Sequence, residues 1–522
     1  MLRLLRAKRQ RVEKNGRAKN GGVQQRFGHC LKTFLEFAQK KPRSILENLL
    51  LKSSLRIREN GNINSSGSNG AIDNRALAMS RPRAFERLKN LSPFEVAQRC
   101  AHLPELIFFD SAVADNASAI SIIAACPYEI VSGSSDADWQ HLREKVRAHQ
   151  LGDSTHLQDG MLRGFAAGFV EYDGAFRFGF YDSLLIYRHD ENAWLEIGDF
   201  FSRLFAKNLP PSRAPQFSQS SNFRLDFQPT MTRENFCRMV ERAQSYIAAG
   251  DIYQVNLSHQ FIAALDEKNR SAENDESFDP LCFYEALRNC SPAPFAAFLR
   301  ESTNDRNGRA VLSCSPESFL QISGSRIRTR PIKGTRPRRV DDSEADEKSA
   351  RDLLTSKKEI AELVMITDLE RNDLGQICEY GSVAVTELLK LERFAQVFHL
   401  VSTVEGQLRA EVDHVSALRA VFPGGSITGA PKKRAREIIA ELEPAPRGLY
   451  TGAIGFFGFN GESRFSIAIR TAIVEKNRRV RCAHFHVGAG IVADSIPEME
   501  YEETLHKAAG ILLAAKRLSH EG

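Results

Sequence analysis

The chain has 522 residues, which is long for one domain, and its 42 % apolar and 26 % charged residues are ordinary for a soluble globular protein. Nine cysteines without a CxxC pair indicate reduced thiols, as in the cytoplasm, and no apolar run approaches the roughly 18 residues that span a membrane. The net charge of +6 arises in residues 1–80, which hold 17 Lys and Arg against 5 Asp and Glu. The remainder is therefore mildly acidic, which argues against a nucleic-acid-binding face.

The basic start of the chain, residues 1–80, is predicted to be a disordered extension. The run NGNINSSGSNG at 60–70 has the composition of a flexible linker. Two alternatives stay open. An Arg-rich, acid-poor start resembles an organellar targeting peptide, and Met79 is a candidate initiator.

From residue 83 onward, apolar patterning predicts folded structure in two regions, 83–225 and 230–517. The predicted strands are 106–111, 119–132, 165–187 and 252–264, and the predicted helices are 232–249 and 343–366. Because strands and helices do not alternate regularly, we predict an α+β fold rather than a doubly wound parallel sheet.

Two predicted helical turns carry glutamates spaced three residues apart, Glu359 with Glu362 and Glu500 with Glu503. Residues at this spacing share one face of a helix. If the two faces met, four carboxylates would surround a hard cation such as Mg²⁺, which prefers oxygen ligands. The alternative is that each pair lies on a solvated helix face.

Lys333 lies in the segment PIKGTRP (331–337). It is flanked by Arg328, Arg330, Arg336 and Arg338. Neighbouring cations would disfavour the ammonium form of Lys333 and leave a nucleophilic amine. The alternative is a basic surface turn.

Two glycine-rich segments, FPGGSITGAPK (422–432) and VGAG (487–490), can offer backbone N–H groups to an anion. The first lacks the GxxxxGK[ST] spacing of a nucleotide-binding loop, so a carboxylate suits it as well as a phosphate. The second has a tight strand bend as its alternative. Arg470 lies in a strand-like run and needs a partner, such as a substrate carboxylate. His399, in VFHLVS, is an acid/base candidate with a core histidine as the alternative.

In their order along the chain, these motifs resemble those of the chorismate-binding family. That family includes the large subunits of anthranilate synthase and aminodeoxychorismate synthase, with isochorismate and salicylate synthases as more distant members. The resemblance covers residues 85–517 and rests on GDIYQVNLS, SCSPESFL, RPIKGTRPR, ITDLERNDLG, FHLVSTVEG, PGGSITGAPK, RGLYTGAIGF, IAIRT and VGAGIVADSIPEMEYEET. It implies one large α+β catalytic unit with two packed, mainly antiparallel β-sheets flanked by helices.

The resemblance also implies an active site for chorismate, with Mg²⁺ bound by Glu359, Glu362, Glu500 and Glu503. Lys333 would form a covalent adduct with the substrate ring, Glu317 would act as the acid, and His399 would lie near the ring. Substrate contacts are implied for Gln254, Thr428, Tyr450, Arg470, Gly488, Ala489, Gly490 and Lys507. A tryptophan pocket is implied at Ser111, Pro294, Phe295 and Ala296.

Two positions separate the branches of the family. Members that use water as the nucleophile have a lysine at the position of Gln254, and glutamine cannot act as that base. Anthranilate synthases read PIAGT, whereas this chain reads PIKGT with Lys333, as aminodeoxychorismate synthases do. The resemblance therefore favours amination of chorismate at C4, on the route to 4-aminobenzoate and folate, with anthranilate synthase activity as the alternative.

Two further predictions concern a partner subunit and whether the chain is catalytically active. The chain has no GxCxGxQ-like amidotransferase motif, so a separate glutamine amidotransferase subunit is expected to supply ammonia. A catalytically inactive regulatory homologue is disfavoured, because Lys333, Glu317 and all four paired glutamates are retained.

Overall fold

The structure is a computed structural model, and it describes residues 82–111, 119–150, 162–206, 225–265, 278–302, 308–394, 397–477 and 480–520. The predicted extension 1–80 and the alternative start at Met79 lie outside these residues. All described residues belong to one unit, Asp73–Gly522.

The larger sheet has twelve strands, all paired antiparallel. In spatial order they are β1 (Arg83–Ala84), β8 (Ala193–Ile197), β7 (Leu184–Arg188), β3 (Ile120–Ala124), β2 (Ile107–Asp110), β11 (Phe295–Arg300), β12 (Ala310–Ser315), β21 (Thr471–Asn477), β22 (Val480–Ile491), β10 (Gln254–Leu265) and β18 (Gly429–Ala430). The short strand β9 (Gln228–Pro229) also pairs with β10. Residues from both predicted regions, 83–225 and 230–517, therefore share this sheet.

The smaller sheet has ten strands and is also antiparallel. Its spatial order is β15 (Ile332–Pro337), β17 (Val397–Gln407), β14 (Arg326–Thr329), β13 (Ser318–Ser323), β20 (Glu462–Ile467), β19 (Ala453–Gly458), β5 (Phe165–Val170), β6 (Phe176–Tyr181) and β4 (Glu129–Gly133). The strand β16 (Ala384–Arg393) also pairs with β17. Two antiparallel sheets with helices confirm the predicted α+β class.

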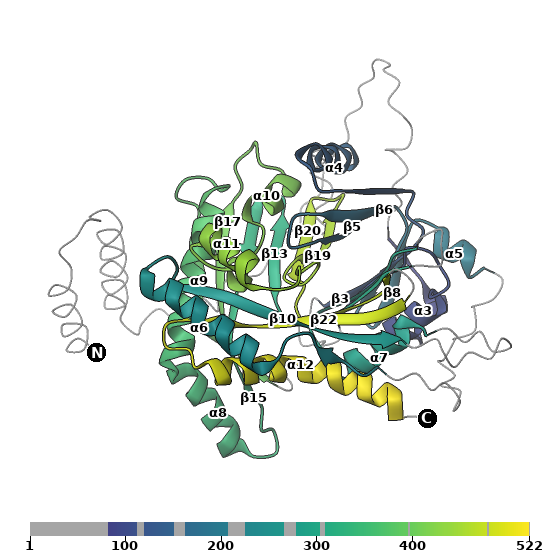
Figure 1. Ribbon diagram of the computed structural model, residues 1–522. Helices are drawn as coiled ribbons and strands as arrows, with labels where there is room; N and C mark the ends of the chain where they lie inside the picture. Colours follow the sequence, from purple (N-terminus) through teal and green to yellow (C-terminus); the bar gives the residue numbers. More distant parts are fainter. Residues whose placement is uncertain are drawn as a thin grey trace. The chain divides into compact units, whose positions relative to one another are not determined.

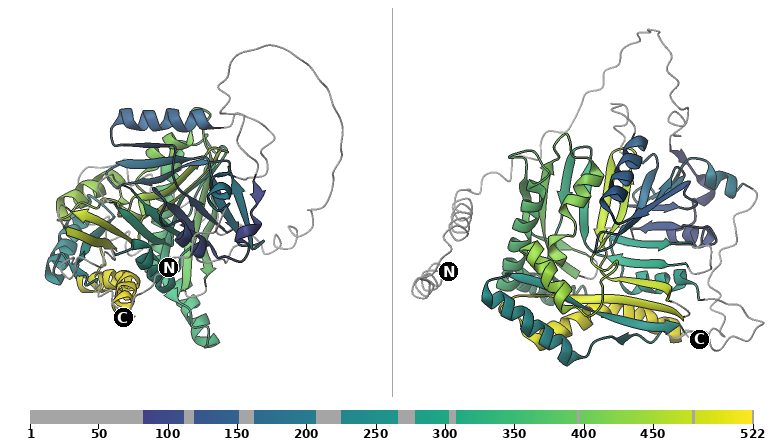
Figure 2. Two further views of the ribbon diagram at one scale, coloured as in Figure 1. Left: turned by 90° about the vertical axis from the view of Figure 1, so that its right-hand side faces the viewer. Right: turned by 45° about the horizontal axis from the view of Figure 1, so that its top comes forward.

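Helices cover the outer faces of both sheets (Figures 1 and 2). Apolar side chains of the two sheets pack together in one core cluster. The larger sheet is covered by α3 (Pro93–Arg99), α6 (Arg233–Ala249), α7 (Pro280–Cys290), α11 (Lys432–Leu442) and α12 (Pro497–His520). The smaller sheet is covered by α4 (Asp136–His149), α8 (Ser343–Thr355), α9 (Lys357–Gly375) and α10 (His414–Val421). The remaining short helices are α5 (Phe200–Leu204), η1 (Glu86–Leu88) and η2 (Gly425–Ile427).

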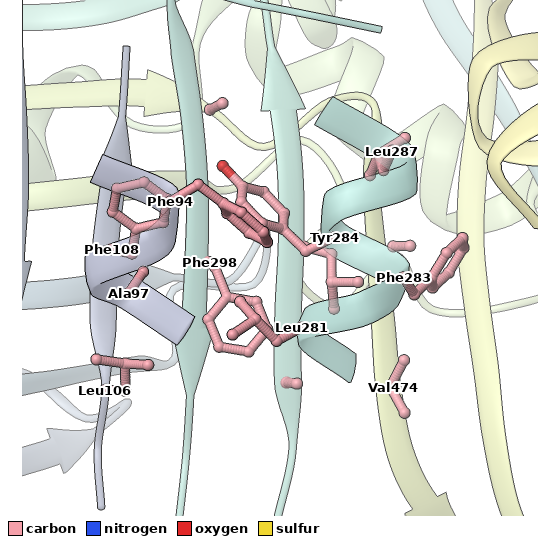
Figure 3. Close-up of a cluster of buried hydrophobic side chains, with 14 of the residues drawn as sticks. Phe94, Ala97, Leu106, Phe108, Leu281, Phe283, Tyr284, Leu287, Phe298 and Val474 are labelled. Carbon is pink, nitrogen blue, oxygen red and sulfur yellow. The ribbon is translucent and has the colours of Figure 1, made fainter. Parts of the chain in front are cut away.

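Aromatic side chains dominate the core between α3, α7 and the larger sheet (Figure 3). Phe108 of β2 and Phe298 of β11 pack against Tyr284 of α7. The Tyr284 hydroxyl is not left unsatisfied in this apolar layer, because it donates a hydrogen bond to Asp110, at 3.2 Å. Burying each of these large side chains contributes roughly 1.5–3 kcal/mol to folding before entropy is counted.

The helix predicted at 232–249 is confirmed as α6. The Thr232 side chain accepts a hydrogen bond from the Asn235 N–H, and Gly250 ends the helix with φ of 84°, a conformation that glycine adopts without strain.

The single helix predicted at 343–366 is wrong, because the chain breaks there into α8 and α9. Ser356 ends the first helix and caps the second, with its side chain accepting from the Glu359 N–H. The break places Glu359 in the first turn of α9. No helix among the described residues is long and apolar enough to cross a membrane.

Candidate active site

Strand β15 brings three consecutive residues to the predicted site, Lys333, Gly334 and Thr335. Lys333 Nζ donates a hydrogen bond to the carbonyl oxygen of Ser426, at 3.3 Å. The Ser426 hydroxyl donates to Glu317 Oε1, at 2.8 Å. Ser426 therefore joins the predicted nucleophile to the predicted acid, a link that its position in PGGSITGAPK did not reveal.

Glu317 is a buried acid, with only 5 % of its surface exposed. Burial raises the pKa of its carboxyl, although the hydrogen bond from Ser426 and the charge of Lys333 act in the opposite direction. A raised pKa keeps more of the carboxyl protonated near neutral pH, and a general acid has to carry its proton before the reaction. The position of Glu317 beside Lys333 therefore suits the role predicted for it.

Strands β10 and β22 pair to form one wall of the site. Gln254 is fully buried, and neither atom of its amide group has a hydrogen-bond partner. A Cβ atom placed on Gly490 would lie 2.9 Å from Gln254 Nε2 and 3.8 Å from Lys333 Nζ. A side chain at position 490 would therefore collide with the Gln254 amide, so glycine is what lets β22 approach this unsatisfied amide and the Lys333 amine closely.

Gly488 is a second position of close approach, where a side chain would not fit. A Cβ atom there would lie 2.8 Å from the Tyr450 hydroxyl oxygen and 3.1 Å from Asn256 Nδ2. Residues 488–490 continue the ladder between β22 and β10, so they form a regular strand rather than the predicted backbone nest or its alternative, a strand bend. The pairing of β22 with β21 ends at Phe485, so residues 488–490 lie beyond that ladder.

Thr428 and Lys507 border the site, but both are engaged within the protein. The Thr428 hydroxyl donates to the carbonyl oxygen of Gly424, at 2.9 Å. The Thr428 carbonyl accepts from the Asn256 N–H, at 2.8 Å, which ties the glycine-rich loop to β10. Lys507 Nζ donates to the carbonyl oxygen of Gly488, also at 2.9 Å. These contacts hold the loop and strand in place, and direct contact of either side chain with the substrate stays a prediction.

His399 and Arg470 line one cavity of about 110 Å³, together with Thr335. Burial lowers the pKa of His399 to about 4, and the nearby charge of Arg470 acts in the same direction. The imidazole is therefore neutral at pH 7, and its Nδ1 atom lies 3.0 Å from the Thr335 hydroxyl. A neutral imidazole favours a positioning role over that of a cationic acid.

Arg470 has a strained backbone, with φ of 50° in the left-handed region that few residues other than glycine adopt. Within the described part of the chain, no carboxylate forms an ion pair with its guanidinium, and burial lowers the pKa of that group. A strained residue with an uncompensated charge beside a cavity suits the binding of a carboxylate.

The four predicted metal ligands lie on two helices that meet. Glu359 and Glu362 are on α9, and Glu500 and Glu503 are on α12. Lys358 of α9 donates a hydrogen bond to Glu500 of α12, at 3.3 Å. The charges of Glu359 and Glu503 also act on Glu362. The two pairs therefore form one acidic cluster, as predicted for facing helices, rather than two separate solvated faces.

Cations accompany all four carboxylates, in pairs formed by Arg336 with Glu359 (3.3 Å), Lys507 with Glu503 (2.7 Å), and Lys358 with Glu500 (3.3 Å) and Glu362 (4.0 Å). Within the described ranges, no three His, Cys, Asp or Glu side chains are already arranged so that they could hold a metal ion. However, Glu362 Oε1 and Glu500 Oε2 are buried without a hydrogen-bond partner. Unsatisfied carboxylate oxygens are the donors that Mg²⁺ prefers, so the residues fit this ion.

The arginines that flank Lys333 do not surround its amine, contrary to the prediction. They form ion pairs elsewhere, Arg328 with Glu405, Arg330 with Glu392, Arg336 with Glu359 and Arg338 with Asp346. The carboxylates of Glu317, Glu362 and Glu503 are the groups that interact electrostatically with Lys333. The environment of the Lys333 amine is therefore acidic.

A larger cavity of about 280 Å³ lies between the two sheets. It is lined by Ser111, Pro294, Phe295 and Ala296, the four residues of the predicted tryptophan pocket. The structure therefore brings these residues together, and the binding of tryptophan stays a prediction.

A second buried carboxyl, Glu370 of α9, was not predicted. It accepts a hydrogen bond from the Thr329 hydroxyl, at 2.7 Å. Burial raises the pKa of Glu370 to about 8, and the negative charges of Glu317 and Asp373 act in the same direction. Glu370 is therefore largely protonated at pH 7.

Replacing Glu370 by glutamine is expected to stabilise the protein increasingly as the pH rises from about 5 to about 8.5. The folded protein keeps the Glu370 proton up to a pKa of about 8, whereas the unfolded chain releases it near its usual pKa of 4.5. The wild type therefore loses stability across this window, by up to roughly 1.4 kcal/mol per pH unit. Glutamine stays neutral and can still accept from Thr329. Urea unfolding across this range measures the effect, and parallel curves for both proteins would contradict it.

A buried ion pair between Arg447 and Glu443 stabilises the backbone next to the site. Arg447 and Glu443 are 1 % and 4 % exposed, and their charged atoms lie 2.7 Å apart. Arg447 also donates to the carbonyl oxygens of Asn256 on β10, at 2.7 Å, and Ile427, at 3.1 Å. The pair therefore holds the loop that contains Ser426 against β10.

Replacing Arg447 by methionine is expected to destabilise the protein by roughly 3–5 kcal/mol, because Glu443 would stay buried without its cation. The double variant Arg447→Met with Glu443→Leu removes both charges and should lose less stability than the single variant. Urea unfolding at neutral pH compares them. A single-variant loss below about 1 kcal/mol would show that the pair behaves like an exposed one.

The family described as chorismate binding enzyme matches residues 107–513. Aminodeoxychorismate synthase component 1 of Escherichia coli (strain K12) is 38 % identical over 454 residues, which are 79 % of this chain and 94 % of the relative. The protein of the same name in Bacillus subtilis (strain 168) is 38 % identical over 381 residues, which are 66 % of this chain and 76 % of the relative. Anthranilate synthase component 1 of Streptomyces coelicolor is 44 % identical over 287 residues, but the match spans only 52 % of that protein.

Solved structures with a similar fold also match this chain. Anthranilate synthase component I from Streptococcus pneumoniae TIGR4 matches with a TM-score of 0.60 and 30 % identity, over 76 % of this chain and 93 % of that one. The menaquinone-specific isochorismate synthase MenF from Escherichia coli matches with a TM-score of 0.64, over 83 % of this chain and 94 % of that one. At 18 % identity, this match shows a shared fold and nothing more. The sequence match, the two antiparallel sheets and the relatives agree, and the chain belongs to the chorismate binding enzyme family.

Proposed function

We propose that this chain is a synthase subunit that converts chorismate and ammonia into 4-amino-4-deoxychorismate, on the route to 4-aminobenzoate and folate. The observation that carries the proposal is the position of Lys333. Its amine lies close to Gly490 and is joined to Glu317 through Ser426. The names of two relatives, both aminodeoxychorismate synthase component 1, support the same activity.

In the proposed reaction, Lys333 first passes its ammonium proton to a carboxylate beside it, and the resulting amine attacks C2 of chorismate and forms a carbon–nitrogen bond. The ring double bonds shift, and the C4 hydroxyl leaves as water with a proton from Glu317. The proton released by the alkylated amine returns to the Glu317 carboxylate. Ammonia then adds at C4 as the bond from C2 to Lys333 breaks, and the proton lost by the added nitrogen passes to the departing lysine amine. The net change replaces one hydroxyl by one amino group and releases one water.

The remaining residues bind and orient the substrate. The guanidinium of Arg470 pairs with the carboxylate of the enolpyruvyl group, and neutral His399 lies near the ring. Tyr450, whose hydroxyl lies close to Gly488, and residues 488–490 border the substrate in this proposal. The Gln254 amide can donate and accept hydrogen bonds, but it cannot take a proton from water, so it does not generate a competing hydroxide nucleophile.

Mg²⁺ is proposed to bind to Glu359, Glu362, Glu500 and Glu503, whose unsatisfied oxygens suit it. When bound, it would supply a Lewis acid that holds and polarises the ring carboxylate of the substrate.

Ammonia is proposed to come from a separate glutamine amidotransferase subunit. The relatives are named component 1, which implies a second component. The purified chain should therefore use ammonium salts but not glutamine, and glutaminase activity of the chain alone would contradict the proposal.

A product assay tests the activity. The purified chain is incubated with chorismate, Mg²⁺ and an ammonium salt, with and without aminodeoxychorismate lyase, and the products are separated by chromatography. The proposal requires 4-aminobenzoate, and only when the lyase is present. Absence of any product, with a folded protein, would overturn it.

The alternative function is that of anthranilate synthase component I. It is favoured by the 44 % identity to the Streptomyces coelicolor protein of that name, although the match covers 55 % of this chain. Anthranilate formed without the lyase would establish it and would remove the proposed role of Lys333.

A further inference from the structure

Lys358 differs from the other cations of the acidic cluster in how it reaches the carboxylates. Its side chain is 53 % exposed, whereas those of Glu500 and Glu362 are 3 % and 12 % exposed. Lys358 Nζ lies 3.3 Å from Glu500 Oε1 and 4.0 Å from Glu362 Oε1. A lysine that is half in solvent thus extends its ammonium over two buried carboxylates from different helices.

The other two cations have structural contacts besides their carboxylates. Lys507 donates to the carbonyl oxygen of Gly488, and Arg336 donates to that of Thr335. The hydrogen bond and ion pairs that the structure shows for Lys358 are all with Glu362 and Glu500. Because its stem is exposed and flexible, Lys358 can leave the cluster without disturbing the fold.

The carboxylates that Lys358 covers are incompletely satisfied. Glu500 Oε1 also accepts a hydrogen bond from the Ser495 hydroxyl, at 2.7 Å, but Glu500 Oε2 has no hydrogen-bond partner. Glu362 Oε1 has none either, and the Lys358 ammonium approaches it only to 4.0 Å. One ammonium therefore compensates part of the charge of two buried carboxylates and leaves one oxygen of each without a hydrogen bond. A divalent cation can satisfy these oxygens, and it would meet the repulsion of Lys358 if the lysine stayed.

We propose that Lys358 is an exchangeable counter-ion that competes with Mg²⁺ for Glu362 and Glu500 and thereby sets the affinity of the cluster for the metal. This inference rests on the metal site of the proposed function. In the metal-free enzyme the ammonium offsets carboxylate repulsion, and on metal binding it moves into solvent. Lys358 thus weakens metal binding and stabilises the metal-free protein.

The test is a titration of the full-length protein with Mg²⁺ alone, followed by isothermal calorimetry in a buffer of fixed pH and ionic strength. Lys358→Gln is expected to bind Mg²⁺ roughly 10-fold more tightly than the wild type, as removal of a unit charge a few ångströms from the ion implies. Its melting temperature without Mg²⁺ should fall, and the increase caused by Mg²⁺ should be larger. Lys358→Arg keeps the charge and should retain an affinity close to that of the wild type.

Lys357→Gln is the matched control. It removes the same charge from the adjacent exposed position on α9 and should leave Mg²⁺ affinity unchanged. Equal tightening in both variants would overturn the proposal, because it would reflect net charge alone, and so would an unchanged or weaker affinity of Lys358→Gln.

Glu500→Gln identifies the titrated site, since it should remove the binding signal in every background. If the wild type itself gave no Mg²⁺ signal, the metal site of the proposed function would fail and this inference with it. If the wild type bound Mg²⁺ through Glu500 and Lys358→Gln matched it, only the inference would fail.

Discussion

Lys333→Ala is expected to abolish the covalent adduct and to lower 4-amination by at least about 10³-fold, the scale of losses seen when a covalent nucleophile is removed. The expected loss is large because Lys333 supplies the amine that lies close to Gly490 and is joined to Glu317 through Ser426. Mixing the protein with chorismate in the absence of ammonia should trap the adduct, and the mass of the intact protein would reveal it in the wild type alone.

Lys357→Ala is the control for Lys333→Ala, because it removes an exposed lysine outside the site and should retain both the adduct and the product. Circular dichroism and thermal melting would establish that both variants fold. Full output of 4-amino-4-deoxychorismate by Lys333→Ala would exclude covalent catalysis by this residue. An adduct on a different lysine would leave the chemistry intact but assign it to the wrong residue.

Glu317→Gln is expected to lower kcat by roughly 10²–10⁴-fold with little change in KM, because the amide keeps the shape of the side chain but has no acidic proton. The Ser426 hydroxyl can still donate to the glutamine oxygen, so the loop should keep its position. Adduct formation should slow by the same factor, since departure of the hydroxyl accompanies the attack of Lys333.

The pH dependence provides a second readout for Glu317. Burial raises the pKa of this carboxyl, and the wild-type rate should fall at high pH as the acid loses its proton. The residual activity of Glu317→Gln should lack this limb of the profile. A variant that retains both the wild-type rate and the wild-type limb would assign the proton to a different group.

Local sequence rules predicted the parts of the structure whose causes are local. The spacing of Glu359 and Glu362 placed them on one helix face, and Gly250 marked the end of α6. The break between α8 and α9 also has a local signal in the sequence. Ser356 and Glu359 form the S-x-x-E pattern of a helix start, which should have divided the predicted helix.

The missed site residues depend on contacts between distant parts of the chain. Ser426 matters because it reaches Glu317, and Arg447 because it reaches the backbone of β10. No local spacing encodes either approach. The prediction that arginines surround the Lys333 amine is wrong for the same reason. Residues that are close in the sequence need not have side chains that are close in space. Which groups surround an amine is decided by the elements packed against its strand.

The position of β22 has a consequence for how the protein folds during its synthesis on the ribosome. This strand lies between β21 and β10, and it is followed by α12, which carries Glu500 and Glu503. Until residues 480–491 have left the exit tunnel, β10 lacks the neighbour with which it forms its longest ladder. While residues 266–479 are being made, the emerging chain therefore presents an unpaired strand edge, a state that favours aggregation and recruits chaperones. Termination before residue 480 would remove both β22 and two of the four proposed metal ligands, Glu500 and Glu503.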